Sequence, residues 1–143
     1  MNLEEASKSF GLDFTVRELI KLRTSQINGC AFCIDMHARD LREHGESEHR
    51  IWGLNAWREA PFFDERERGA LALAEEMAGL AGGQGVSDAV YDEAARVFTA
   101  DELLGVVWTA TAINAWNRLS ICTRRAPAGR EPRIRAAAAA AGA

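Results

Sequence analysis

The segment of this sequence that is best equipped for chemistry is residues 30–37, Cys-Ala-Phe-Cys-Ile-Asp-Met-His. Two cysteines separated by two residues at the start of a helix lie within bridging distance over a single turn. The unpaired N–H groups and the positive dipole end of such a helix favour the thiolate, which is the nucleophilic form of cysteine. Oxidation of Cys30 and Cys33 to a disulfide would therefore give a two-electron switch, in which one sulfur attacks and the other resolves a sulfenic acid.

A histidine accompanies the cysteine pair. His37 follows Cys33 by four residues, so on a helix the two side chains share one face. An imidazole in this position can accept or donate a proton near neutral pH. Cys30, Cys33 and His37 together form a nucleophile, a resolving thiol and an acid/base group.

Paired cysteines have four other common roles in proteins, and each makes its own demand on the sequence. A structural zinc site needs about four ligands, and the residues of suitable chemistry are Cys30, Cys33, His37 and the distant Cys122. Covalent haem attachment needs a His directly after the second cysteine, where this sequence has Ile34. A thioredoxin-type fold needs a strand before the motif, and no strand is expected there. An inert pair of buried thiols is the last alternative. We predict a redox dithiol with no metal and no cofactor.

Composition and charge narrow the possible partners. The net charge is −4 and no basic stripe is available to offset phosphates, so we expect no nucleic-acid partner. The basic residues between Arg124 and Arg135 are interpreted as a solvated tail. No apolar run approaches the roughly 20 residues that a membrane span needs, and residues 1–9 are unlike a signal peptide. We therefore expect a cytoplasmic protein, in which three cysteines do not form a disulfide framework.

The secondary structure of the chain is predicted to be all helical, because strand-type alternation is absent and β-branched runs are rare. Six to seven helices are expected in a compact bundle. They cover residues 3–10, 15–28, 30–44, 47–59, 64 to the Gly-rich loop at 79–85, 87–98 and 99–123. Residues 1–134 are predicted to form one domain, followed by a disordered Ala-rich tail at 135–143.

Several residues mark where these helices begin and what they bury. Capping boxes are predicted at Thr15/Glu18, Asp64/Glu67 and Thr99/Glu102, and single N-caps at Ser47 and Ser87. Four tryptophans at helical spacing are expected to fill the core or a subunit interface: Trp52, Trp57, Trp108 and Trp116. Asn114 and Asn117 are expected to hydrogen-bond within the core, and Cys122 to be a small core or helix-end residue.

The spacing of four residues resembles a known family. A Glu is followed after eleven residues by a C-x-x-C pair, and this pair is followed after three residues by a His. In this chain the four residues are Glu18, Cys30, Cys33 and His37. This pattern is similar to that of the alkylhydroperoxidase-D-like branch of the carboxymuconolactone decarboxylase family. The segments 37–45 and 112–119 also resemble that branch, and the likeness covers residues 14–124.

The resemblance implies an all-helical subunit that assembles as a homotrimer or homohexamer, and a peroxiredoxin-like alkylhydroperoxidase activity. Cys33 would attack a small organic hydroperoxide, Cys30 would resolve the product, and a dithiol reductant would restore both thiols. Glu18 and His37 would form the proton relay that generates the thiolate. One position departs from the pattern, because the best-studied members carry a His between the cysteines where this chain has Phe32.

Alternatives to the peroxidase hypothesis remain at this point. Glu18 would have no catalytic duty if it capped a helix together with Thr15. Lactone decarboxylation, like that of the family's namesake, needs acid/base groups but no thiol pair, so the C-x-x-C motif argues against it. A non-enzymatic metal-binding or scaffold protein is the third possibility.

Overall fold

The computed structural model describes residues 3–127, and every regular element within this range is helical. The elements are α1 (Leu3–Lys8), α2 (Phe14–Asn28), α3 (Ala31–Glu43), α4 (Glu48–Gly53), the 3-10 helix η1 (Leu54–Ala56), α5 (Glu65–Gly79), the 3-10 helix η2 (Leu80–Gly82), α6 (Asp88–Val97) and α7 (Ala100–Cys122). The prediction of an all-α fold is confirmed. The predicted Ala-rich tail at 135–143 and most of the basic cluster lie outside the described residues.

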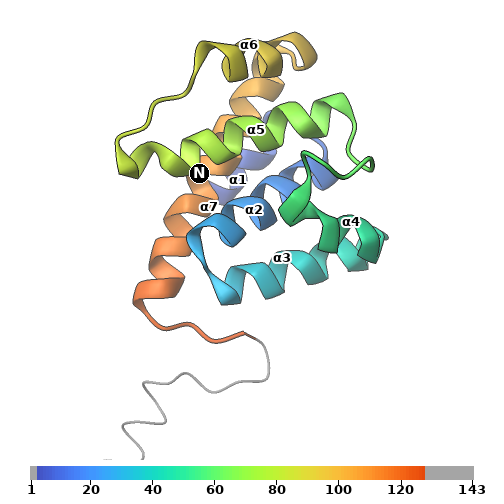
Figure 1. The fold of residues 1–143 in the computed structure, drawn as a ribbon. Helices are drawn as coiled ribbons and strands as arrows, with labels where there is room; N and C mark the ends of the chain where they lie inside the picture. The colour runs from blue at the N-terminus through green and yellow to red at the C-terminus, as the bar shows by residue number, and fades with distance from the viewer. Residues whose placement is uncertain (1–2, 128–143) are drawn as a thin grey trace, which may run out of the picture.

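Helix α2 is the centre of the bundle and packs against α3, α5 and α7 (Figure 1). Its Ile20 belongs to a core cluster that includes side chains of α5, α6 and α7. Its Leu19 and Leu22 belong to a second cluster, which includes side chains of α3 and α5. All three side chains are almost completely buried, and burial of each stabilises the fold by about 1.5–3 kcal/mol. The helix that carries Glu18 is thus held on several sides.

The N-terminus of α2 differs from the sequence prediction. Asp13 is the N-cap and its carboxylate accepts a hydrogen bond from the Val16 N–H at 2.9 Å, so the helix begins at Phe14. The predicted Thr15/Glu18 capping box is therefore wrong. An aspartate is at least as good a cap as a threonine, and its choice leaves the Glu18 side chain free for another partner.

The turn between α2 and α3 presents the cysteine pair. Gly29 ends α2 in the left-handed conformation (φ 70°), which glycine adopts without steric cost. Cys30 is then the N-cap of α3, and its Sγ accepts a hydrogen bond from the Cys33 N–H at 3.3 Å. Helix α3 ends before Gly45, as the sequence predicted.

The segment predicted as one helix over 47–59 is shorter in the structure. Ser47 caps α4 as expected, but the helix ends at Gly53 and is followed by η1. Glycine has low helix propensity, which explains a break at this position. Trp52 is 69 % exposed in the single chain, so it does not fill the core, and its place in a subunit interface stays a prediction; Trp57 is buried and its indole N–H donates to Glu75 at 2.8 Å.

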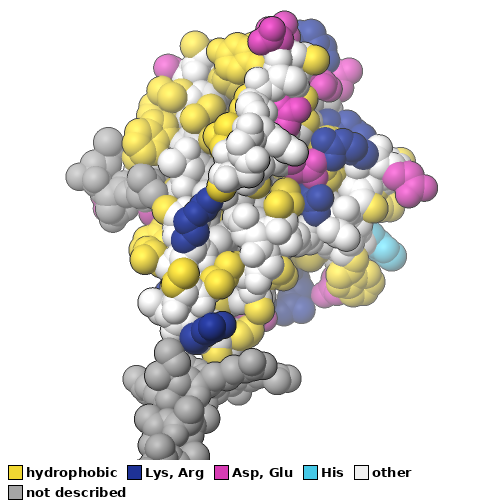
Figure 2. Space-filling view, turned by 60° about the vertical axis from the view of Figure 1, so that its left-hand side comes forward, with side chains coloured by type: hydrophobic (Ala, Val, Ile, Leu, Met, Phe, Trp, Pro, Cys, Tyr) yellow, Lys and Arg dark blue, Asp and Glu magenta, His cyan; other side chains and the backbone are white. Residues whose placement is uncertain are grey.

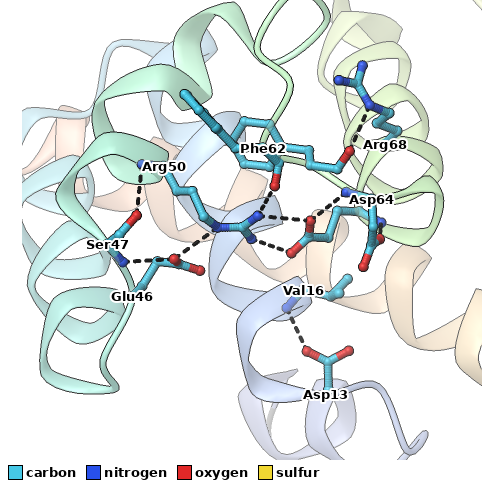
Figure 3. A network of polar contacts seen from close by, with 10 residues as sticks. Asp13, Val16, Glu46, Ser47, Arg50, Phe62, Asp64 and Arg68 are labelled. Atoms are coloured by element: carbon cyan, nitrogen blue, oxygen red, sulfur yellow. Dashed lines mark hydrogen bonds and ion pairs between the residues drawn. The ribbon is translucent and has the colours of Figure 1, made fainter.

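A polar network fastens the connection between α4 and α5 (Figure 3). The Arg50 guanidinium donates to Glu46 at 2.9 Å, to Glu67 on α5 and to the Phe62 carbonyl of the intervening loop. The Asp64 side chain accepts from the Glu67 N–H while Glu67 accepts from the Asp64 N–H, which confirms the predicted capping box. The network adds polar contacts to a loop that also places Phe63 in the core.

The capping box of α7 is formed by Thr99 and Glu102, and it allows the contribution of one carboxylate to stability to be tested. Hydrogen bonds from Arg66 and from the Thr99 N–H lower the pKa of Glu102 to about 2. Because the folded state holds this carboxylate ionised, its stabilisation is complete above pH 4.5 and is lost as the pH falls toward 2. We expect Glu102→Gln to lower the free energy of unfolding by about 1 kcal/mol at pH 7, as measured by urea denaturation.

The difference between wild type and Glu102→Gln should shrink as the pH is lowered through 4.5 toward 2. Glu93→Gln, on the exposed face of α6, is the matched control and should change stability little at any pH. A Glu102→Gln penalty that stays constant down to pH 3 would contradict the assignment.

Candidate active site

The four residues singled out in the sequence come together where α2, the turn after it and α3 meet. Cys30 and Cys33 form a disulfide, with their Cα atoms 5.4 Å apart, and each residue is about 1 % exposed. The His37 Nδ1 lies 2.7 Å from the Glu18 Oε2, and both residues are buried. One site thus contains a redox pair, an imidazole and a carboxylate.

The hydrogen bond to Glu18 orients the His37 ring. A carboxylate can only accept, so the Nδ1 atom of a neutral imidazole carries the proton in this bond and Nε2 keeps the free lone pair. The Nε2 atom is buried and has no hydrogen-bond partner among the described residues. Because His37 follows Cys33 by one turn on the same helix face, this nitrogen is the one available for proton transfer with Cys33.

Glu18 remains a carboxylate although it is buried. Desolvation raises its pKa, but the hydrogen bond from His37 and the charge of Lys21 outweigh that effect, so the pKa is lowered. The Lys21 Nζ lies 3.0 Å from Glu18 and 2.6 Å from Glu4 on α1. Lys21 was missed by the sequence analysis, although its i,i+3 spacing from Glu18 is a pattern that pairs charges on a helix.

Asp40 is a further acidic group beside the imidazole. Its Oδ2 lies 3.9 Å from the His37 Nδ1, and desolvation together with the nearby charge of Glu18 raises its pKa. The ligand atoms of Glu18, His37 and Asp40 lie within 4.8 Å of one another. The ammonium group of Lys21 already neutralises one oxygen of Glu18, which weakens this group as a cation site.

The zinc alternative raised by the sequence is not supported. Cys30 and Cys33 are bonded to each other, and Cys122 is exposed at the last position of α7. The position of Cys122 at the end of α7 confirms the prediction of a helix-end residue. A disulfide and one imidazole nitrogen, the Nε2 of His37, do not provide the four ligands of a structural zinc site.

A cavity of about 580 Å³ opens onto Cys33, His37 and Glu18. Most of its exposed lining is apolar, with side chains from α2, α3 and α7: Phe14, Phe32, Met36, Ile113 and Trp116. Trp116 is 43 % exposed and borders this cavity instead of filling the core. The sequence analysis missed these walls, because they come from three separate segments.

A buried amide network fixes the position of Cys30. The Asn28 side chain donates to Asn114 and to Asn117, both at 2.9 Å, and Asn117 donates to the Ser25 hydroxyl at 3.0 Å. The Cys30 N–H donates to the Ser25 carbonyl at 3.0 Å. The expectation that the two α7 asparagines hydrogen-bond within the core is confirmed for Asn117, and Asn114 is half-buried. Together they tie the end of α2 to α7.

Comparison with known proteins identifies relatives of this chain. The model of the carboxymuconolactone decarboxylase family matches residues 1–76, a range that contains all four site residues. The chain is 42 % identical over 121 residues to the uncharacterized protein YdfG of Bacillus subtilis, covering 85 % of this chain and 82 % of YdfG. No helix within residues 3–127 is long and apolar enough to cross a membrane.

Two solved structures share the fold. One is a protein of unknown function from Agrobacterium tumefaciens, provisionally described as the antioxidant defence protein AhpD. It is 36 % identical with a TM-score of 0.84, covering 90 % of this chain and 87 % of that one. The other is a peroxidase-related protein with an alkylhydroperoxidase AhpD core from Ralstonia eutropha JMP134. It is 21 % identical with a TM-score of 0.72, covering 83 % of this chain and 62 % of that one.

The Glu18–His37 bond predicts the reactivity of the reduced site. A carboxylate at Nδ1 stabilises the imidazolium that forms when Nε2 takes a proton from Cys33. We expect Glu18→Gln to slow alkylation of Cys33 by iodoacetamide at pH 7 by roughly tenfold, as measured by peptide mass spectrometry of the reduced protein. Glu59→Gln, on the surface, should alkylate at the wild-type rate. Equal rates in Glu18→Gln and wild type would show that the carboxylate does not act on the thiol.

Proposed function

The chain belongs to the alkylhydroperoxidase-D-like branch of the carboxymuconolactone decarboxylase family, and from this premise we propose that it is a thiol-dependent peroxidase of organic hydroperoxides. The observation that carries the proposal is the joint presence, on one cavity, of Cys33 and an imidazole whose far nitrogen is held by a carboxylate. The second thiol, Cys30, lies within bonding distance. Lactone decarboxylation needs acid/base groups but would make no use of this cysteine pair.

In the first step, His37 Nε2 accepts the proton of the Cys33 thiol. The thiolate attacks the distal oxygen of the hydroperoxide, an S–O bond forms, and the O–O bond breaks with its electron pair on the alkoxide. The alkoxide takes the proton back from His37 and leaves as an alcohol. The products are the Cys33 sulfenic acid and one molecule of alcohol per hydroperoxide.

In the second step, the Cys30 sulfur attacks the Cys33 sulfur. The S–O bond breaks, and hydroxide leaves with the thiol proton as water. The resulting disulfide is the state of the cysteines in this structure. A dithiol reductant then returns two electrons and two protons and becomes a disulfide itself, which closes the cycle.

The cavity walls support an organic rather than an inorganic peroxide as substrate. A cavity of about 580 Å³ is far larger than hydrogen peroxide requires, and its lining is mostly apolar. Burial of an alkyl or aryl group against Phe14, Met36 and Trp116 would contribute about 25 cal/mol per Å² of apolar surface. That binding energy would hold the peroxide oxygen beside Cys33.

Single-cysteine variants test the proposed peroxidase activity. With cumene hydroperoxide and dithiothreitol, Cys33→Ser should consume peroxide at the background rate, because the attacking sulfur is gone. Without dithiothreitol, Cys30→Ser should consume one equivalent of peroxide and keep a sulfenic acid on Cys33 that dimedone labels. His37→Asn should lower kcat/KM by roughly 100-fold.

Cys122→Ser is the matched control and should keep wild-type turnover, because this cysteine is exposed at the end of α7. Full peroxide consumption by Cys33→Ser would overturn the proposal. Lactone decarboxylation that survives alkylation of both Cys30 and Cys33 would favour the namesake activity of the family.

We further propose that the subunits assemble as a homotrimer or homohexamer. Helix α7 is apolar nearly all round, a pattern typical of helices that are covered on every side. Three of its large apolar side chains are nevertheless 43–55 % exposed in the single chain: Leu104, Trp116 and Leu119. Apolar side chains also reach the surface in several places on the face seen in Figure 2.

Light scattering after size-exclusion chromatography tests the assembly. We expect a mass of three or six times the 15.7 kDa of one chain, because burial between subunits would remove the exposed apolar side chains of α7 from water. Leu119→Lys should shift the mass toward the monomer without loss of helical circular dichroism. A wild-type mass of one chain at micromolar concentration would contradict this proposal.

A further inference from the structure

The Cys30–Cys33 disulfide lies between two cavities. The first cavity, described above, is bordered by Cys33 and not by Cys30. A second cavity of about 590 Å³ is bordered by Cys30 and not by Cys33. It is formed by the start of α3 around Ala31 and by residues 120–127 at the end of α7. The two cysteines of the disulfide thus border different cavities.

One shared wall separates the two cavities. Phe32, Ser120 and Arg125 border both of them. The Arg125 guanidinium carbon lies 4.1 Å from the centroid of the Phe32 ring, which is cation–π geometry. Phe32 lies between the two cysteines in the sequence. In this chain an aromatic ring at that position supplies part of the partition.

The two cavities differ in charge. The first contains the acidic groups Glu4, Glu18 and Asp40 together with basic residues. The charged residues that border the second are Arg124 and Arg125 alone, and neither has a carboxylate partner within residues 3–127. A thiolate is an anion, so the second cavity favours its approach to a disulfide sulfur.

The chemistry of disulfide exchange also selects Cys30 as the sulfur that is attacked. In such an exchange the sulfur that leaves fastest is the one whose thiolate is better stabilised. His37, held by Glu18, lies one turn beyond Cys33 and can give a proton to that sulfur as it leaves. The groups that make Cys33 the nucleophile toward peroxide therefore make it the leaving group when the disulfide is reduced.

We propose that the second cavity is the binding site of a small dithiol reductant, which attacks Cys30 while the hydroperoxide uses the first cavity. This inference rests on the proposed dithiol–disulfide cycle. The reductant thiol releases its proton to solvent and its sulfur forms a bond to the Cys30 sulfur. The Cys30–Cys33 bond breaks with its electron pair on Cys33, which takes up a proton from solvent by way of His37. The second thiol of the reductant then attacks the mixed disulfide, so that Cys30 leaves as a thiol and the reductant as a cyclic disulfide.

Separate measurement of the two half-reactions tests the assignment. Ala31 is exposed and borders the second cavity only, whereas Met36 borders the first cavity only. Disulfide-form protein is prepared with diamide and reduced by dithiothreitol, and reduced protein is oxidised by cumene hydroperoxide, both in rapid-mixing experiments. Ala31→Trp should slow reduction by roughly tenfold or more and leave oxidation within about twofold of wild type.

Met36→Trp should show the opposite pattern, with oxidation slowed and reduction retained. Ala89→Trp, an exposed residue of α6 that borders neither cavity, is the matched control for both rates. If Ala31→Trp slows both half-reactions equally, or only oxidation, the assignment of the second cavity is overturned.

The attacked sulfur can also be identified directly. Diamide-oxidised wild type is treated with 2-mercaptoethanol, quenched with acid, alkylated and mapped by tandem mass spectrometry. The mixed disulfide should lie on Cys30, and a mixed disulfide on Cys33 would overturn the inference. Because diamide prepares the disulfide, these reduction experiments decide the reductant site even if hydroperoxide fails to oxidise the protein, a result that would instead refute the proposed peroxidase.

Discussion

The buried bond between Glu18 and His37 is the interaction on which the site depends, because it joins α2 to α3 and leaves Nε2 as the imidazole nitrogen without a hydrogen-bond partner among the described residues. An unpaired carboxylate inside a protein is costly, so the bond persists only if the charge is balanced. Lys21 supplies that balance on the same helix, and Glu4 extends the chain of charges to α1. Charged residues of α1 and α2 are thus linked to the imidazole of α3.

The same constraint explains why the two sulfurs differ although they are only three residues apart. Cys33 lies on the face of α3 that also carries His37, and it borders the cavity with mixed charges. Cys30 is the N-cap, tied to α2 and α7 through Ser25, and it borders the cavity whose charges are arginines. An imidazole on one side only makes the disulfide chemically asymmetric, which is what a cycle with two different reagents requires.

Sequence reasoning succeeded where the signal is local. The C-x-x-C pair at the start of a helix and the i,i+4 spacing of His37 were read from eight consecutive residues. The role of Glu18 was ambiguous, because Thr15 offered a cap and only the structure shows Asp13 taking that position. The cavities and their partition depend on contacts between the start of α3 and the end of α7, nearly 90 residues apart, and no local pattern encodes them. Partial burial of a tryptophan such as Trp52 depends on tertiary packing in the same way.

A count of free thiols before and after one equivalent of an alkyl hydroperoxide decides whether Cys30 and Cys33 are a redox pair for peroxide. The fully reduced chain has three thiols. We expect one thiol to remain after treatment of wild type, because Cys30 and Cys33 become a disulfide and Cys122 stays reduced. In Cys30→Ser the count should fall from two to one, with the loss on Cys33. If wild type still had three thiols after one equivalent of hydroperoxide, Cys30 and Cys33 would not be oxidised by peroxide and the proposed cycle would be wrong.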